Sequence, residues 1–467
     1  MRIAAMALLG ALCLTGGAAR AGGFQILEHG AVSTGMANAR TAVADDASAL
    51  YFNPAAITEL PGLQLELGVT GILPYIHYRA AGNPEPPRTY PTYRDGRYTF
   101  AEVNDGTHST DAKLRGFSPI HLYASYSFEG IGLTVGYGLN NPFGLGTFWP
   151  GDWDGRFIAT ETEIQTFFNQ PTAALSLSEL LGFGDRFKLS LAVGYSFVYA
   201  TARLAKHIDL RAAEAPSQGT IRDPEGEMAM DGSATGHGYN FALYAELPGW
   251  LALGASLRSG IRLPFSGTAE FRFDAAGRQA LELLQLDFPQ RTRGELVMDL
   301  PWNMNFGLAF LGLADLTVAF DVYASFFQSY DALELEFACV ADETCSSELD
   351  AGPIAKNWHT AWQFSLGLEY RLFDALAIRA GYGTVLSPVP ADTYDPSLPD
   401  GRRDLIALGL GYRGAWWKVD LGYMLALWAG TKDNDVGAGD NLNPEGKADG
   451  RYETITHMLA LSVSIWL

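Results

Sequence analysis

Histidines and cysteines are the side chains most suited to catalysis or metal binding, and here their spacing supports neither. The eight histidines are scattered over the 467 residues; none lies in a nucleophile elbow or forms a pair at metal-binding spacing. His121 and His457 fall on the polar faces of alternating segments, which favours a packing role. The sequence therefore predicts no enzyme activity, no metal site and no cofactor.

Two cysteines, Cys339 and Cys345, lie in one polar stretch, FACVADETCSS. In an oxidising compartment, a local disulfide that pins a loop is the simplest interpretation of this pair. A zinc site is the poorer alternative, because no second pair of Cys or His ligands accompanies it. The third cysteine, Cys13, lies in an apolar run that lacks the small-residue box of a lipoprotein.

Residues 1–21 have the pattern of a secretory signal peptide. Arg2 precedes an apolar run, and Ala19-Arg20-Ala21 places small residues at the two positions that signal peptidase reads. We expect cleavage after Ala21, export and no lipid anchor. The formal charge of −20 argues against nucleic acid as a partner, because phosphate backbones are bound by basic patches.

Strict alternation of apolar and polar residues dominates the chain after this segment. In FKLSLAVGYSF (187–197), every second residue is Phe, Leu, Val or Tyr, and the residues between them are Lys, Ser, Ala or Gly. No stretch of roughly 18 apolar residues predicts a transmembrane helix. About fourteen segments alternate in this way. The predicted strands are 62–73, 117–128, 131–140, 164–179, 187–204, 238–247, 251–263, 293–310, 314–328, 360–372, 375–386, 403–412, 416–428 and 455–467.

The connections between these segments alternate between short and long. The short ones are 129–130, 180–186, 248–250, 311–313, 373–374 and 413–415, and the long ones are 74–116, 141–163, 205–237, 264–292, 329–359, 387–402 and 429–454. Short turns at one end and long loops at the other are typical of an outer-membrane barrel, whereas a soluble sandwich has no reason to sort them. We therefore predict an all-β fold, a 14-stranded antiparallel transmembrane β-barrel over 62–467, in the bacterial outer membrane.

A barrel of this size encloses a lumen too wide for its own side chains to fill. The segment before it contains DDASALYFNPAAITEL (45–60), which predicts two short helical turns. Asp45 or Asp46 is expected to cap the first turn and Asn53 the second, with Pro54 at the first helical position. We expect residues 22–61 to fold inside the barrel as a hatch.

The same segment resembles the N-terminal hatch of the FadL-type long-chain fatty acid transporters, a family that also contains toluene and xylene channels. The resemblance rests on Gly-Phe-Gln (23–25), the Ala-Asp-Asp-Ala run (44–47) and Asn53-Pro54-Ala55. Further motifs follow in family order, so the resemblance covers essentially the whole chain: GLNNPFGL (138–145), KLSLAVGYSFVYATARL (188–204), ALYAELPGWLALGASLRSGI (242–261) and AIRAGYGTVLSPVPADTYDPSLPDGRRD (377–404).

The resemblance implies a gap in the barrel wall where the third strand bends inward, at Asn140, Asn141 and Pro142. Pro142 cannot donate to a strand ladder, which gives the interruption a physical cause of its own. The alternative is that Pro142 only ends the strand into a loop.

Ligand capture in this family begins in an apolar groove between two extracellular loops, here 205–237 and 264–292. Leu281, Leu284 and Phe288 have the spacing of a short amphipathic helix that could receive an acyl chain, or that simply packs on the barrel rim. The family binds the ligand carboxylate with basic residues, which by local alignment are Arg203 or Lys206, and Lys356. Each could equally be a solvated loop charge.

The function predicted from these features is passive uptake of hydrophobic molecules, long-chain fatty acids first among them, with lateral release at the third strand. An aromatic-hydrocarbon channel is the alternative, since such a channel needs no cation. A general diffusion porin is a further alternative, against which the hatch argues. The expected partners are the ligand, outer-membrane lipid and the barrel-assembly machinery, and the protein is expected to be a monomer.

Overall fold

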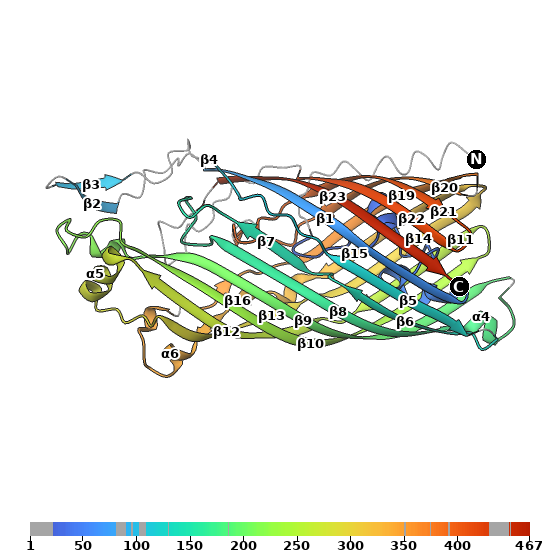
Figure 1. The fold of residues 1–467 in the computed structure, drawn as a ribbon, viewed down its shortest axis with the longest axis horizontal. Coiled ribbons are helices and arrows are strands. Elements are labelled where there is room, and N and C mark those ends of the chain that lie inside the picture. Colours follow the sequence, from blue (N-terminus) through green and yellow to red (C-terminus); the bar gives the residue numbers. More distant parts are fainter. Residues whose placement is uncertain are drawn as a thin grey trace.

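The computed structural model describes residues 22–80, 90–94, 97–101, 109–128, 130–184, 186–349, 352–373, 375–390, 393–428, 448 and 450–467. The predicted signal peptide, 1–21, lies outside these residues. The described chain forms a closed antiparallel barrel of fourteen strands around its N-terminal segment (Figure 1). The first strand closes the barrel by pairing with the last, from Gln64↔Trp466 to Ala80↔Gly450.

Ten barrel strands are continuous and four are interrupted. The continuous strands are β1 (Leu63–Ala80), β8 (Glu161–Ser176), β9 (Lys188–Asp209), β10 (Glu225–Leu247), β15 (Leu316–Phe326), β19 (Thr360–Leu372), β20 (Leu376–Leu386), β21 (Arg403–Arg413), β22 (Trp417–Trp428) and β23 (Gly450–Trp466). The interrupted strands are β4/β5 (Ser109–Asp111, Ile120–Phe128), β6/β7 (Leu133–Asn140, Gly144–Phe148), β11/β12 (Leu251–Arg258, Ile261–Phe273) and β13/β14 (Arg291–Leu300, Trp302–Leu313).

The remaining elements are short. The N-terminal segment contains α2 (Ala31–Gly35), α3 (Ala49–Phe52) and η1 (Pro54–Glu59). The connections contain β2 (Tyr90–Arg94), β3 (Arg97–Ala101), α4 (Leu177–Leu180), η2 (Arg211–Ala213), α5 (Ala275–Leu284), η3 (Phe327–Ser329), β16 (Ala332–Leu333), β17 (Leu335–Phe337), α6 (Ala338–Ala341), η4 (Ser347–Leu349) and β18 (Ile354–Ala355). Among the described residues, no helix has the length and apolar character needed to cross a membrane.

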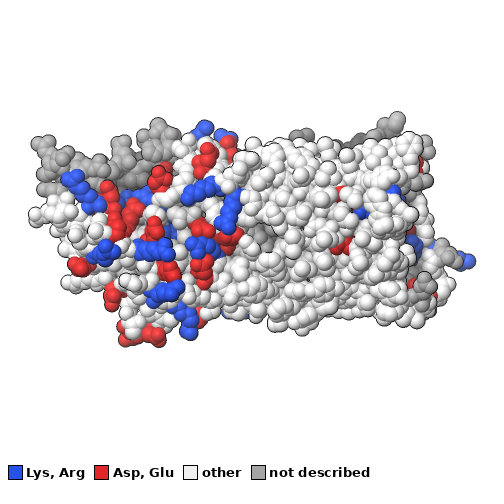
Figure 2. Space-filling model, in the orientation of Figure 1, with Lys and Arg blue, Asp and Glu red and all other residues white. Residues whose placement is uncertain are grey.

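Alternation along the strands separates an apolar outer face from a small or polar inner face. On β9, Leu191 and Val193 are 44% and 50% exposed, whereas Ser190 and Ala192 between them are buried. Figure 2 shows Lys, Arg, Asp and Glu gathered at the end that carries α5 and α6, beside a broad belt with few charges. This belt has the chemistry of a surface that faces lipid.

Several predicted strand limits are wrong, and each has a physical reason. Most of 205–237 is strand rather than loop. β9 continues to Asp209, β10 begins at Glu225, and these two residues pair with each other. Beyond the apolar belt the outward side chains become polar, such as Glu227 and Asp231 on β10, so the apolar outer face that marked the strands is lost. The predicted strand 293–310 is broken at Pro301, which has no N–H for the ladder.

The N-terminal segment fills the lumen with a core of its own. Val32, Met36, Leu50, Phe52 and Ile57 are each no more than 2% exposed. Glycines on the inner face of the wall let the backbone of this segment approach closely: Gly254 and Gly307 lie against Thr41, Gly367 and Gly381 against Met36, and Gly409 and Gly422 against Gly35. We refer to residues 22–61 as the hatch.

Candidate ligand pathway

A wall carboxylate binds the hatch backbone directly. Oδ2 of Asp321 on β15 accepts hydrogen bonds from the N–H groups of Arg40 and Thr41, at 2.8 and 2.7 Å. The same oxygen accepts from the hydroxyl of Tyr323, which also donates to the carbonyl of Asn38 at 2.5 Å. All of these groups are buried, so the hydrogen bonds fix the hatch turn at residues 38–41 to the wall.

A buried ion network forms a second attachment between hatch and wall. Its closest hatch–wall contact joins Lys418 Nζ on β22 to Asp46 Oδ2 at 2.9 Å, with both side chains at most 7% exposed. The contacts are Arg40–Asp45 2.5 Å, Arg40–Asp46 3.1 Å, Lys418–Asp46 2.9 Å, Lys418–Asp420 3.1 Å, Arg379–Asp420 2.7 Å, Arg379–Glu369 2.7 Å, Arg371–Glu369 2.9 Å and Arg371–Asp45 3.8 Å. Four cations and four anions balance in this network.

Asp46 fulfils the expected capping role only in part: its Oδ1 accepts from the N–H of Ser48 at 3.1 Å, just before α3. The residue before α3 is Ser48, whose side chain makes no cap hydrogen bond, and both aspartates belong to the ion network. Burial alone would raise the pKa of Asp46, but Lys418 and Arg40 lower it to about 2. Against its burial, the pKa of Asp45 is lowered too, mainly by Arg40, so both carboxylates are charged at neutral pH. The β22 partner of Asp46, Lys418, is too distant in sequence for a local pattern to indicate it.

Asn53 both caps η1 and contacts the wall. Its Oδ1 accepts from the N–H of Ala55 at 3.2 Å, as the capping pattern predicts, and Pro54 lies at the start of the helix. Its Nδ2 donates to the carbonyls of Thr41 and of Leu243 on β10, at 2.9 and 3.0 Å. The amide thus links two hatch turns to each other and to the barrel.

The third strand is interrupted between Asn140 and Gly144. β5 and β6 pair from Phe128↔Leu133 to Leu122↔Leu139, whereas β7 pairs with β8, and among the described residues no pairing joins β7 to β5. Pro142 lies in the interruption, and the buried side chain of Asn140 lies with Tyr123 over Gly138. The wall consequently has a break between the segments 115–120 and 143–147.

Asn141 spans this break with its side chain. Its Oδ1 accepts from the N–H of Ile120 on β5 at 3.1 Å, and its Nδ2 donates to the carbonyl of Thr166 on β8 at 2.7 Å. These two bonds replace ladder hydrogen bonds that the kinked backbone cannot make. The side chain of Asn141 therefore stabilises the wall at the break.

The first residues of the hatch bind the inner side of the break. The N–H of Ile26 donates to the carbonyl of Pro142 at 2.9 Å, and the N–H of Gly144 donates to the carbonyl of Phe24 at 3.0 Å. No local sequence pattern indicates this coupling, because residues 24–26 and 142–144 are far apart in the chain. Movement of residues 24–26 must therefore alter the hydrogen bonding of the third strand.

A cavity of about 500 Å³ lies between the hatch N-terminus and the break. Its lining includes both sides of the break, at 115–120 and 143–147, and inner wall residues such as Ile72, Ile164 and Met458. On the side of the long loops, Phe24 packs against two aromatic rings: its ring centroid lies 5.3 Å from that of Phe327 and 6.0 Å from that of Trp358.

Two of the cations that line the cavity are paired with acids. Arg403 donates to Asp400 Oδ1 at 2.7 Å and to the carbonyl of Gly23 at 3.1 Å. Arg115 lies 3.4 Å from Glu163. Neither guanidinium is therefore an unpaired site for a carboxylate inside the cavity.

The three predicted carboxylate-binding cations occupy different places, and none lines the cavity. Arg203 lies on the outer face of β9, 40% exposed, and pairs with Glu161 at 3.0 Å and Asp231 at 2.6 Å, as expected for the alternative of a solvated charge. Residues an even number of positions apart on a strand point to the same face, so Arg203 lies on the outer face with the exposed Tyr199.

Lys206 and Lys356, in contrast, both approach Asp395. Lys206 shares the inner face of β9 with the buried Ala202, interacts electrostatically with Asp395, and forms no ion pair with a described residue. Lys356 is 2% exposed and forms an ion pair with Asp395. Burial alone would lower the pKa of Lys356, but the Asp395 carboxylate raises it above its ordinary value, so this lysine is charged.

The predicted loop groove is filled in this structure. Leu281 is buried and Leu284 and Phe288 are half-buried, packed with Leu210 and Ile221 of the loop after β9. This face of α5 packs against the loop after β9. The apolar side chains of the two loops thus cover each other.

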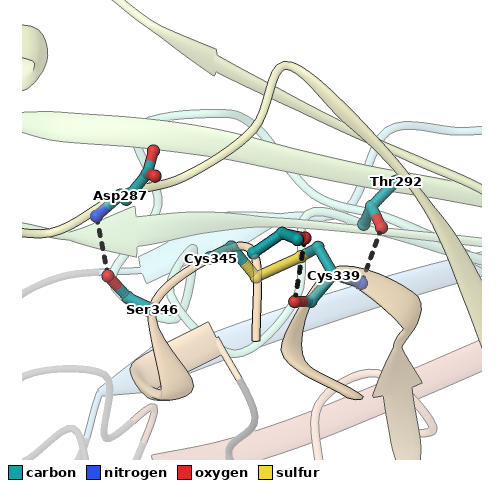
Figure 3. The surroundings of a disulfide bond; sticks show 6 residues. Asp287, Thr292, Cys339, Cys345 and Ser346 are labelled. Carbon is teal, nitrogen blue, oxygen red and sulfur yellow. Dashed lines mark hydrogen bonds between the residues drawn. A yellow bond between two sulfur atoms is a disulfide. The ribbon is translucent and has the colours of Figure 1, made fainter. Parts of the chain in front are cut away.

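A disulfide joins Cys339 and Cys345 beside this loop region, with their Cα atoms 5.4 Å apart (Figure 3). The N–H of Cys339 donates to Thr292 Oγ1 on β13 at 3.2 Å, and the N–H of Asp287 donates to Ser346 Oγ at 2.7 Å. The small ring is therefore attached both to the barrel and to the loop after α5.

A family model described as outer membrane protein transport protein (OMPP1/FadL/TodX) matches residues 12–466. The chain belongs to this family. A long-chain fatty acid transport protein of Salmonella typhi is 24% identical over 418 residues, covering 84% of this chain and 83% of that one. This member of the OMPP1/FadL/TodX family is thus an outer-membrane transport protein.

Two solved structures share its fold. A Pseudomonas aeruginosa FadL homologue has a TM-score of 0.77 at 20% identity and covers 95% of this chain and 100% of its own. The Pseudomonas putida toluene transporter TodX has a TM-score of 0.66 at 15% identity, with 95% and 99% covered. The predicted fold class and family resemblance are confirmed.

Proposed function

We propose that this protein takes up hydrophobic molecules, long-chain fatty acids first among them, by diffusion without an energy source. The observation that carries the proposal is the cavity of about 500 Å³, which has apolar inner walls and reaches both sides of the break in the third strand. Its volume is within the range of small-molecule sites. Ligand leaves sideways through the break into the lipid.

The hatch is the moving part of this proposal. Phe24 packs against Phe327, and residues 24–26 bond to the third strand at Pro142 and Gly144. Displacement of this segment both clears the lumen and loosens the break. Asn53, Pro54 and Ala55 hold the rest of the hatch against β10 while the N-terminal segment moves. If Asn53→Ala leaves uptake unchanged in an assembled barrel, this role of the Asn53 turn is wrong.

Two lysines favour an anionic ligand. Lys206 and Lys356 lie near one carboxylate, Asp395, so this group carries a formal excess of one positive charge. A fatty acid carboxylate could be held there on its way inward. The Salmonella typhi relative is named a long-chain fatty acid transport protein, which agrees with this choice.

An aromatic hydrocarbon is the second candidate ligand. The specific observation in its favour is that Arg403 and Arg115, which line the cavity, are both paired with acids. A cavity without a free cation suits a neutral molecule. The fold shared with the toluene transporter TodX is compatible with either ligand.

Binding of a labelled long-chain fatty acid to the purified protein, with toluene as competitor, tests the choice. Saturable binding that weakens in the Lys206→Ala/Lys356→Ala variant supports the fatty acid. Binding that toluene displaces, and that is equally strong in the wild type and in this variant, supports the hydrocarbon. Arg203→Ala is the matched control, because it removes an outward-facing cation. If neither compound binds the assembled wild type, the proposed function is wrong.

A further inference from the structure

We propose that Phe117 closes the opening in the wall and limits the width of the molecules that pass through it. This inference rests on the proposed lateral release. Phe117 lies between β4 and β5, on one side of the break, and lines the cavity together with Gly146 on the other side. It is the aromatic side chain that reaches from the first side of the break to the second.

The backbone of Phe117 is fixed to the neighbouring strand. Phe117 and Ile72 of β1 form an isolated antiparallel bridge, with the N–H of Ile72 donating at 2.8 Å and the N–H of Phe117 donating at 2.9 Å. The position from which the ring extends is therefore set by β1. Motion of the ring leaves this pair of hydrogen bonds intact.

The ring lies directly on the backbone of β7. A Cβ atom at Gly146 would overlap two carbons of the Phe117 ring and lie 3.1 Å from a third, so only glycine allows this approach. The ring also stacks beside Phe148, with centroids 6.4 Å apart and an angle of 22° between the planes. The Phe117 ring thus lies between the two sides of the break, which Asn141 spans with hydrogen bonds and where Arg115 lies over the Phe148 ring.

This arrangement is suited to a gate because the ring is held by packing alone on the β7 side. No pairing joins β7 to β5 among the described residues, so no ladder must open when the ring swings away. Rotation of a half-buried side chain is fast compared with strand separation. The width of the passage then depends on the size of residue 117.

Uptake of a narrow and a wide hydrophobic probe into liposomes that contain the protein tests this inference. Straight-chain palmitate is the narrow probe and the four-ring hydrocarbon pyrene is the wide one. Phe117→Ala should raise the pyrene-to-palmitate rate ratio on the order of tenfold, the change that about 1.4 kcal/mol of barrier represents. Phe117→Trp should lower the ratio, which keeps the test valid if the alanine variant assembles poorly.

Phe306→Ala is the matched control, because Phe306 lies on β14 at the outer face, 53% exposed, and does not line the cavity. An unchanged ratio in both Phe117 variants, with normal wild-type uptake of palmitate, overturns the gate and leaves the proposed function standing. An equal increase for both probes also overturns the width limit. Failure of wild-type protein to pass either probe contradicts the proposed function instead.

Discussion

Replacement of Lys418 by Met removes a wall cation from the network that holds the hatch, while keeping a long side chain. In the wild type, Lys418 Nζ lies 2.9 Å from Asp46 on the hatch and 3.1 Å from Asp420 on its own strand. The variant leaves both carboxylates buried with one cation fewer. We expect the hatch to open more often while the barrel stays closed.

The size of this effect follows from the remaining contacts. Loss of one partner of a buried ion pair costs about 3–5 kcal/mol. Asp46 keeps Arg40 at 3.1 Å and Asp420 keeps Arg379 at 2.7 Å, so the lower limit applies. A change of about 3 kcal/mol raises the population of the open hatch roughly 100-fold.

Amide hydrogen exchange of the protein in lipid nanodiscs measures this population. Exchange of hatch amides in 31–59 should accelerate roughly 100-fold in Lys418→Met, whereas amides of β10 should not change. Lys113→Met is the control, because Lys113 is exposed at the rim, and its hatch exchange should match the wild type. Hatch exchange that stays at the wild-type rate in an assembled Lys418→Met barrel would refute the role of the ion network.

Three further predictions follow from the hatch and the loops. Because the pKa of Asp46 is lowered from 3.8 to about 2, its ion pairs stabilise the hatch fully above about pH 4, and hatch exchange should accelerate as the pH falls from 4 to 2. Gly254→Ala places a Cβ 2.6 Å from the carbonyl carbon of Thr41 and should destabilise the closed hatch by about 1–3 kcal/mol, seen as faster hatch exchange than in the wild type. The mature protein should have no free thiol before reduction and two after it, from Cys339 and Cys345, and two thiols without reductant would contradict the disulfide.

The strands could be predicted because lipid imposes a repeating constraint on each of them. The predicted strand 187–204 corresponds to β9, which differs mainly by extending to Asp209. The same constraint disappears beyond the belt, so the outer half of β10, with Glu227 and Asp231, looks like loop in sequence. The turn at Asn53-Pro54 was predictable because a cap and its helix are neighbours in the chain.

The contacts that build the pathway could not be predicted, because they join distant parts of the chain. Asp46 and Lys418 are 372 residues apart, and each looks like an ordinary charge in its own segment. Phe117 and Gly146 meet only because the third strand breaks between their segments. The outward orientation of Arg203 is different, because it follows from the alternation within the predicted strand 187–204, where residue 203 shares a face with Tyr199.

The central claim is that ligand occupies the cavity between the hatch N-terminus and the break in the third strand. A crystal structure with a brominated long-chain fatty acid tests it directly, since the bromine atoms give an anomalous signal that locates the chain. We expect bromine peaks between residues 24–28 and the segments 115–120 and 143–147. Ligand bound only among the outer loops, with the cavity empty at saturating ligand, would contradict it.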